Sequence, residues 1–218
     1  KILIDNGHGV DTPGKRSPDG KFREYHYVRE IAKAIETELK FLHFDAERIV
    51  TEVTDISLDE RVTRVNDICT VNGASNVILI SIHCNASKNG EWGKARGWSA
   101  YTSKGNTDSD TLATMMYIEA AKNFTGQFIR KDFSDADPDW EEDFYLLRRT
   151  KCPAVLTENF FMDNKQDLAY ATQSMGRAIF AIDANGKIIN YKGVDSHLEN
   201  KEISPTKLVG SKSVYISN

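Results

Sequence analysis

The chain contains little cysteine and no run of residues that could cross a membrane. Its three cysteines, Cys69, Cys84 and Cys152, are scattered and form no CxxC pair, which argues against a disulfide framework and a structural zinc knuckle. We expect them to be small buried apolar residues, at least one of them free because three thiols cannot all pair. No stretch is long and apolar enough to span a bilayer.

Motifs for nucleotide and serine chemistry are also missing. No GxGxxG or GxxxxGK[ST] loop is present, so no motif supports nucleotide binding. No GxSxG elbow supports a serine hydrolase. The formal net charge of −4 comes without a polybasic or acidic tail, and phosphate contacts need clustered Lys and Arg. We therefore expect no nucleic-acid partner.

The length and composition predict one substantial domain. With 218 residues, of which 40% are hydrophobic, the chain can bury a real core. The apolar pattern fades after Tyr191, so we expect a folded domain over residues 1–192 and a polar tail of unknown role over residues 193–218. Lys1 begins a strand without an initiating Met and no signal peptide is visible. We expect a processed or trimmed form, in which a missing signal is no evidence against export.

Apolar periodicity predicts strands that alternate with helices. The expected strands cover residues 1–4, 47–53, 76–83, 97–102, 154–157 and 186–191, and the expected helices cover residues 24–42, 58–72, 108–124 and 164–182. The nearly continuous apolar run over 77–82 is typical of a central strand buried on both faces. The alternation predicts an α/β fold, with a mixed, mostly parallel central sheet sandwiched by helices.

Some details of these helices and loops can also be predicted. Ser57 is the expected N-cap of the second helix, with Glu60 completing a capping box. The apolar stripe of that helix is expected at Leu58, Val62, Val65 and Cys69, and the third helix has apolar positions at Leu112, Met115, Met116, Ile118 and Ala121. Residues 131–143 are rich in Asp and Glu and contain Trp140. We expect them to form a surface loop beside a cleft.

The titratable residues most indicative of function are His8, Glu24, His83 and Glu158. Three of them follow or end predicted strands, and Glu24 begins a predicted helix. In open α/β sheets, functional sites lie just beyond the carboxyl ends of the strands. Two imidazoles and one carboxylate suit a catalytic zinc site with an open fourth position. We therefore expect His8, Glu24 and His83 to be the ligands of one zinc ion and Glu158 to transfer protons.

Each of these residues also has an ordinary structural interpretation. A histidine after a strand is commonly hydrogen-bonded in a loop or core, and Glu24 complements a helix dipole. Glu158 could pair with Arg148 or Arg149, and His26 is a rival ligand two residues from Glu24. The remaining histidines suit a helix end at His43 and an exposed tail at His197.

At these same motifs the chain resembles the zinc-dependent N-acetylmuramoyl-L-alanine amidases of the type-3 cell-wall class. The matching segments are Ile4-Asp5-Asn6-Gly7-His8-Gly9, Glu24 before an Ile-Ala helix, Leu58-Asp59-Glu60-Arg61, Ser81-Ile82-His83-Cys84-Asn85-Ala86, Pro153-Ala154-Val155-Leu156-Thr157-Glu158, and Asn164. They occur in the family's order between about residues 2 and 180. The Ser-Ile-His-x-Asn-Ala segment is the most specific of them.

The resemblance implies a zinc hydrolase/phosphorylase-like fold and one zinc ion. It implies ligands at His8, Glu24 and His83, and a catalytic glutamate at Glu158. The implied reaction is hydrolysis of the amide that joins the lactyl group of N-acetylmuramic acid to L-alanine in peptidoglycan. The implied partner is peptidoglycan or a muropeptide, and we expect a monomer that acts in the periplasm or cell wall. A lysin made in the cytoplasm is the alternative.

The chain departs from the family pattern at three positions. Val10 stands where a second glycine is common, Tyr25 where a lysine or polar residue is usual, and Phe160 where glycine is found. These changes affect the expected shape of the cleft and leave the four chemical residues in place. Two other functions remain open: a zinc exopeptidase or deacylase of similar fold, and a non-catalytic cell-wall binding module.

Overall fold

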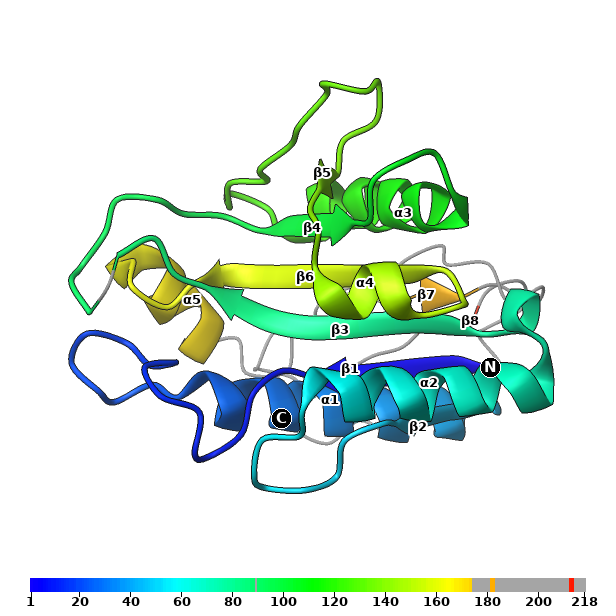
Figure 1. The fold of residues 1–218 in the computed structure, drawn as a ribbon. Coiled ribbons are helices and arrows are strands. Elements are labelled where there is room, and N and C mark those ends of the chain that lie inside the picture. Colours follow the sequence, from blue (N-terminus) through cyan, green and yellow to red (C-terminus); the bar gives the residue numbers. More distant parts are fainter. Residues whose placement is uncertain (89, 174–180, 183–211, 214–218) are drawn as a thin grey trace, which may run out of the picture.

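The computed structural model describes residues 1–88, 90–173, 181–182 and 212–213 (Figure 1). The strand predicted over 186–191, His197 and nearly all of the 193–218 tail lie outside these residues. Of the helix predicted over 164–182, residues 165–173 are confirmed, whereas residues 181–182 form a short strand. The division into a domain and a tail therefore stays a prediction.

Helices and strands alternate along the chain. The strands are β1 (Ile2–Asn6), β2 (Ala46–Arg48), β3 (Ile78–Asn85), β4 (Ser99–Thr102), β5 (Trp140–Glu141), β6 (Ala154–Phe161), β7 (Ala181–Ile182) and β8 (Lys212–Ser213). The helices are α1 (Glu24–Phe41), α2 (Leu58–Asn72), α3 (Asp108–Asn123), α4 (Tyr145–Arg149) and α5 (Lys165–Gln173), with a 3-10 turn at Ala74–Asn76. No described helix has the length and apolar character needed to cross a membrane.

Six strands form one mixed sheet in the order β2-β1-β3-β6-β4-β5. The four adjacent strands β2, β1, β3 and β6 run parallel to one another. β4 is antiparallel to β6 and parallel to β5. The prediction of a mixed, mostly parallel sheet is confirmed. Because β1, β3 and β6 are parallel neighbours, their carboxyl ends lie along one edge of the sheet (Figure 1).

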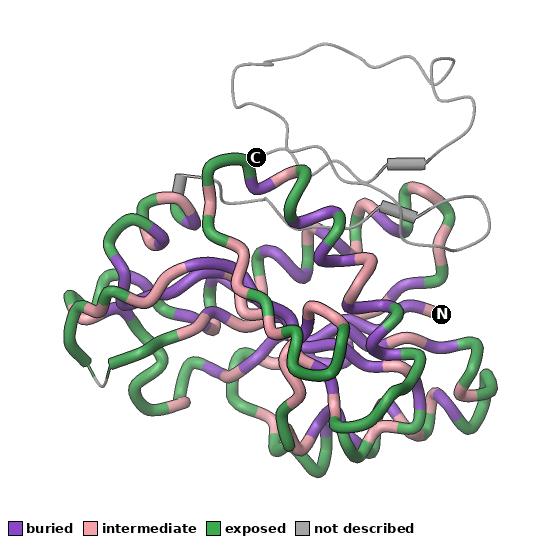
Figure 2. The backbone as a smooth tube through the Cα atoms, turned by 90° about the horizontal axis from the view of Figure 1, so that it is seen from above, coloured by how far each residue is buried: buried purple, intermediate pink, exposed green. Residues whose placement is uncertain are grey.

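Two hydrophobic layers cover the sheet, one on each face. Side chains of β1 alternate between the faces, as strand geometry requires: Ile2 and Ile4 pack in one buried cluster and Leu3 in the other. The first cluster contains residues of α1, α3 and α5, and the second contains residues of α2 and α4. The strands are the most deeply buried part of the backbone trace and the connecting loops the most exposed (Figure 2). The predicted helix–sheet–helix sandwich is confirmed.

The predicted positions of these helices are confirmed, but only some of their apolar residues are buried. Ser57 caps α2, because its side chain accepts a hydrogen bond from the Glu60 backbone N–H at 3.2 Å. The Glu60 carboxylate instead accepts from Arg64, so it does not close the expected capping box. Leu58 is 51% exposed, so its place in the buried face of α2 was predicted wrongly. On α3, Ile118 is 50% exposed.

The cysteine prediction is confirmed. Cys69, Cys84 and Cys152 are all buried and free. The Cys84 thiol, next to His83, donates a hydrogen bond to the Phe160 carbonyl oxygen at 3.4 Å.

Two predicted strands differ in length from the structure: the strand predicted over 47–53 covers only Ala46–Arg48, and the strand predicted over 154–157 is longer. The strand continues to Phe161, so Glu158 lies inside the strand and not after it. The pairing register shifts between His83↔Glu158 and Asn85↔Phe161, which leaves one extra residue on β6, as in a β-bulge. Phe160, at this irregularity, has φ +69° and is buried. Glycine adopts such a positive φ without strain.

Phe160 offers a test of this backbone conformation. Its ring packs against Phe124 and Tyr170, so we expect Phe160→Ala to reduce the free energy of unfolding by about 3–5 kcal/mol. Phe160→Gly should be about 1 kcal/mol more stable than Phe160→Ala, because glycine adopts positive φ without strain. Urea unfolding of the two variants measures this difference. A glycine variant less stable than the alanine variant, the usual order inside a strand, would contradict it.

Candidate functional site

His8 lies two residues beyond β1, in a turn with little room for side chains on either side. Its own φ is +60°. A Cβ placed on Gly7 would overlap the His83 ring, and a Cβ on Gly9 would overlap the backbone of residues 54–55. The two glycines therefore allow the His8 turn to pack against β3 and the neighbouring loop. This is the physical reason for the Gly-His-Gly sequence.

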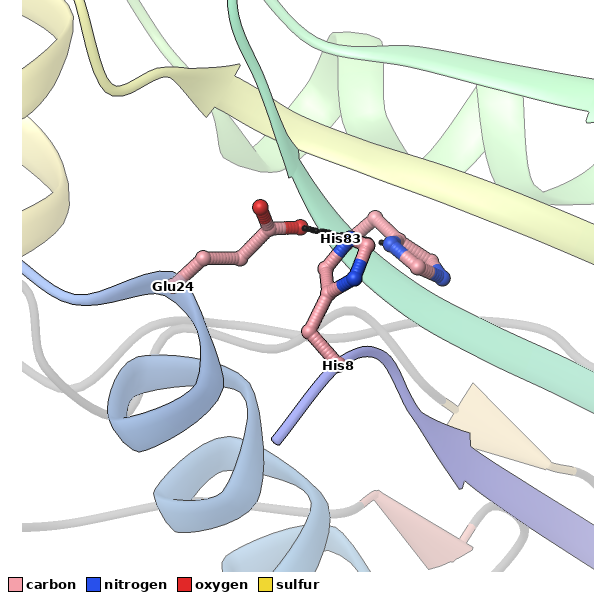
Figure 3. Close-up of side chains that lie close together, drawn as sticks. All are labelled: His8, Glu24 and His83. Carbon is pink, nitrogen blue, oxygen red and sulfur yellow. Dashed lines mark hydrogen bonds and ion pairs between the residues drawn. The ribbon is translucent and has the colours of Figure 1, made fainter. Parts of the chain in front are cut away.

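Glu24 is the first residue of α1, and its carboxylate points toward the adjacent imidazole rings of His8 and His83 (Figure 3). Its Oε1 atom is 3.5 Å from His8 Nε2 and 3.2 Å from His83 Nδ1. The same oxygen accepts a hydrogen bond from the Cys84 backbone N–H at 3.0 Å. The other oxygen, Oε2, is buried and has no hydrogen-bond partner. One carboxylate oxygen of Glu24 therefore lacks a hydrogen-bond donor among the described residues.

The structure brings together the three predicted metal ligands. One ligand atom from each of His8, Glu24 and His83 lies within 4.8 Å of the others. The two imidazole rings meet edge to face, with centroids 5.0 Å apart. Two nitrogens and one carboxylate oxygen on three separate elements fit a divalent metal ion with a coordination position left open.

Burial and the charge of Glu24 act in opposite directions on the pKa values of the two histidines in this cluster. Burial lowers the pKa of His8 to about 4, although Glu24 acts in the other direction. His8 is therefore neutral at pH 7, the form that binds metals. Burial also tends to lower the pKa of His83, but its hydrogen bond and ion pair with Glu24 raise that pKa above its ordinary value. The pKa of Glu24 is lowered, because its two histidine neighbours outweigh its burial.

Glu158 lies beside the cluster. It pairs in register with His83 across the β3–β6 ladder, and its Oε2 atom is buried without a hydrogen-bond partner. Burial raises its pKa to about 8, partly opposed by His83. The alternative pairing with an arginine is not made: Arg148 pairs with Asp143 at 2.9 Å, and Arg149 packs over the Tyr145 ring.

A cavity of about 690 Å³ opens over these residues. Its lining includes His8, His83 and Glu158, the cation of Lys15, and an apolar wall that contains Phe144 and Tyr145. Phe144 and Tyr145 directly follow the acidic segment, but none of residues 131–143 lines this cavity. The cavity therefore does not confirm the prediction that residues 131–143 border a cleft. Cavities of this size take substrates of several hundred daltons.

A buried ionic network fixes the end of β1, two residues before His8. Arg61 of α2 is 2% exposed and binds the Asp5 carboxylate and, at 2.9 Å, the Asn6 carbonyl oxygen. Ser81 donates to the other Asp5 oxygen at 2.5 Å. Removing one member of such a network leaves a buried charge unpaired. The network therefore fixes β1 against β3 just before the turn that carries His8.

The other histidines within the described residues lie apart from the site. The His26 side chain is 63% exposed and lies 3.5 Å from Glu30 on the surface of α1, so the structure does not support it as a rival ligand. His43 follows the end of α1, and its backbone N–H binds the Lys40 carbonyl oxygen. Its predicted position near a helix end is confirmed.

Comparison with known proteins identifies the family of this fold and site. The profile of the N-acetylmuramoyl-L-alanine amidase family matches residues 2–189. The chain belongs to this family. The amidase CwlM of Bacillus licheniformis is 30% identical over 170 residues, which cover 77% of this chain and 58% of that protein. The sporulation-specific amidase of Bacillus subtilis is 27% identical over 85% of this chain and 66% of its own length.

Solved structures of the amidase family share the fold. An N-acetylmuramoyl-L-alanine amidase from Clostridium difficile 630 superposes with a TM-score of 0.64 at 25% identity, covering 78% of this chain and 84% of that chain. The curated amidases are longer: the matched regions span 58% and 66% of their length.

Several residues around this amidase-family site were not assigned roles from the sequence. Asp5 and Arg61 belong to segments that matched the family, yet their pairing joins residues 56 positions apart. Lys15 and Phe144 line the cavity from loops and Tyr145 from the first position of α4, and none of them belongs to a recognisable motif. A basic residue in the first loop was the only available signal for Lys15.

Gly7 provides a test of the packing behind the turn that carries His8. In Gly7→Ala the new methyl group would displace the His83 ring, so we expect metal affinity to fall by about 10- to 100-fold, as when supporting groups of a metal site are lost. Gly20→Ala is the matched control, since Gly20 has φ +71° and open space around it. It should lose some stability but keep its metal. Titration with a competing chelator measures both, and equal metal affinity in the two variants would contradict the expected clash.

Proposed function

We propose that this protein hydrolyses the amide bond between the lactyl group of N-acetylmuramic acid and L-alanine in peptidoglycan, and that it uses one zinc ion. In this proposal His8, Glu24 and His83 hold the zinc and Glu158 transfers the proton. The observation that carries the proposal is the convergence of these three ligand atoms within 4.8 Å, with Glu158 paired across the ladder from His83. Membership of the amidase family supports the same bond specificity.

Zinc fits the donor set better than the harder divalent cations do. Imidazole nitrogen is a favoured zinc ligand, whereas Mg²⁺ and Ca²⁺ prefer sites made entirely of oxygen. The buried Oε2 atom of Glu24, which lacks a hydrogen-bond partner, supports a cation in contact with this carboxylate. When bound in such a site, zinc acidifies water and polarises the carbonyl of the scissile amide.

Glu158 suits the role of proton carrier. Its carboxylate faces the same cavity as His8 and His83 and keeps one oxygen free of other hydrogen bonds. Its pKa of about 8 results from burial, and a nearby cation would move that pKa down towards neutrality. A group with a pKa near the working pH can accept a proton from the attacking water and return it to the departing amine.

The cleft around the site suits a substrate that is part peptide and part sugar. Phe144 and Tyr145 supply apolar contact area, and Lys15 supplies a positive charge beside the catalytic groups. Peptidoglycan lies outside the cytoplasmic membrane, so we propose an extracytoplasmic site of action. We also propose that residues 1–192 form the catalytic domain, which is supported by a family profile that ends at residue 189.

Two substitutions separate the proposed roles of metal ligand and proton carrier. Glu158→Gln should keep its zinc and lose about 10²- to 10⁴-fold in kcat, because the amide cannot accept the proton. His83→Ala should lose most of its zinc and its activity together. Metal analysis and turnover of the same protein samples measure both quantities.

Matched controls come from the same regions of the chain. His26→Ala removes the exposed histidine near Glu24, and Glu142→Gln removes an exposed carboxylate near the cleft. Both should keep wild-type zinc content and turnover. Full activity in Glu158→Gln would remove Glu158 from the mechanism, and wild-type zinc content in His83→Ala would show that the ligand set is wrong.

Digestion of purified peptidoglycan tests the proposed bond specificity. Mass analysis should detect free stem peptides that begin with L-alanine and intact glycan strands, and a chelator should stop their release until zinc is restored. Free peptides incubated in parallel distinguish an exopeptidase, which would shorten them. Cleavage of free peptides without release of stem peptides from the glycan would overturn the proposed activity.

A further inference from the structure

A second cluster of possible metal ligands lies away from the histidines, beside the edge strands β4 and β5. It consists of Asp110, in the first turn of α3, and of Asp137 and Asp139, in the loop that leads to β5. One carboxylate oxygen from each lies within 4.8 Å of the others. All three donors are oxygen atoms, in contrast to the site at His8 and His83.

Two of these carboxylates are almost completely buried. Asp139 is 1% exposed and Asp110 is 5% exposed. Both face the hydroxyl group of Thr102, whose Oγ1 atom lies 2.6 Å from Asp139 Oδ2 and 3.1 Å from Asp110 Oδ1. A hydroxyl group has one proton to donate, so it can satisfy only one of the two carboxylates at a time. Asp110 has a second donor, the Thr107 backbone N–H, in the capping box of α3. Asp139 therefore depends more on Thr102 than Asp110 does.

The remaining charge is not balanced by any ion pair in the part of the chain that the structure describes. No Lys, Arg or His there forms a salt bridge with Asp110, Asp137 or Asp139. Arg130, in the same loop, packs over the rings of Trp140 and Phe161. Asp139 Oδ1 is buried without a hydrogen-bond partner. An unpaired buried carboxylate is costly unless a cation or a proton neutralises it.

We propose that Asp110, Asp137 and Asp139, beside Thr102, form a binding site for a calcium ion. Calcium takes carboxylate oxygens in flexible geometry and completes its shell with water or carbonyl oxygens, whereas Mg²⁺ needs a near-ideal octahedron. Burial raises the pKa of Asp139 to about 7, against the hydrogen bond from Thr102 and together with the hydrogen bond and charge of Asp137 and the charge of Asp110. This is consistent with a carboxylate that lacks a counter-charge.

Calcium at this position would tie together three segments at the edge of the sheet. Thr102 lies on β4, Asp110 lies in the first turn of α3, and Asp139 directly precedes β5, which pairs with β4 through Tyr101↔Trp140. The next turn of the chain carries Phe144 and Tyr145 into the cavity. Calcium would therefore stabilise the loop and the wall of the cleft without contact with His8, Glu24 or His83.

The test measures calcium binding directly on the zinc-loaded protein, so that the histidine site is already filled. Extracellular calcium modules bind with Kd values of about 10⁻⁴–10⁻³ M. Calcium at ten times its Kd should raise Tm by about 3–6 °C, and Mg²⁺ at the same concentration should raise it less. Terbium(III), a luminescent calcium substitute, should emit when Trp140, next to Asp139, is excited, and calcium should displace it.

Two variants and a matched control complete the test. Asp139→Asn keeps the shape of the side chain and an acceptor for Thr102, so we expect it to be at least as stable as wild type without calcium and to lose the calcium response. Asp137→Asn, at a half-buried position, should also lose the response if Asp139→Asn fails to fold. Asp135→Asn makes the same charge change in the same loop at an exposed position outside the cluster, and it should respond like wild type.

Two results would overturn the proposal. One is a wild-type protein whose Tm and terbium emission do not respond to calcium, which would mean that a shared proton alone neutralises the cluster. The other is an equal calcium response in wild type, Asp139→Asn and Asp137→Asn, which would mean that the ion binds elsewhere. Neither readout uses catalytic activity, so the outcome is independent of the proposed amidase function.

Discussion

The buried carboxylate of Glu24 is the group on which the functional site depends. It is 1% exposed, yet one of its oxygens contacts both His8 and His83 and the other has no hydrogen-bond partner. A carboxylate in that position is stable only beside a positive charge. The arrangement therefore selects for a cation, and the two imidazoles, one of them with a strongly lowered pKa, are suited to share that cation with Glu24.

Keeping the carboxylate there requires α1, β1 and β3 to meet at one place. Arg61 joins α2 to the end of β1 through Asp5. Arg29 of α1 donates to the Gly7 carbonyl oxygen at 3.4 Å and to the Glu52 carbonyl oxygen at 3.1 Å. These two guanidinium groups connect the His8 turn to helices on opposite faces of the sheet. The planar, multidentate donor geometry of arginine suits both positions.

The parts of the fold that follow from local pattern could be predicted, and those that depend on distant contacts could not. The apolar run in β3 and the periodicity of α1 identify both elements, because burial dictates their composition. Glu158 and the residue after it interrupt the apolar pattern of β6, so its last residues gave no strand signal. Only the ladder with β3 continues the strand to Phe161. Leu58, at the start of α2, fits the helical pattern but meets no partner layer.

The same distinction explains why one candidate metal site could be predicted from the sequence and the other candidate could not. Histidines that follow apolar strands are uncommon enough that His8 and His83 indicate metal binding when they occur with Glu24. Acidic residues in a loop are ordinary surface residues, so the segment 131–143 indicated only solvent exposure. Asp139 differs because β5 joins the sheet edge beside it and Thr102 lies beneath it, and both contacts are tertiary. Burial, which the sequence pattern does not encode here, turns an ordinary acidic loop into a group of carboxylates that needs a counter-charge.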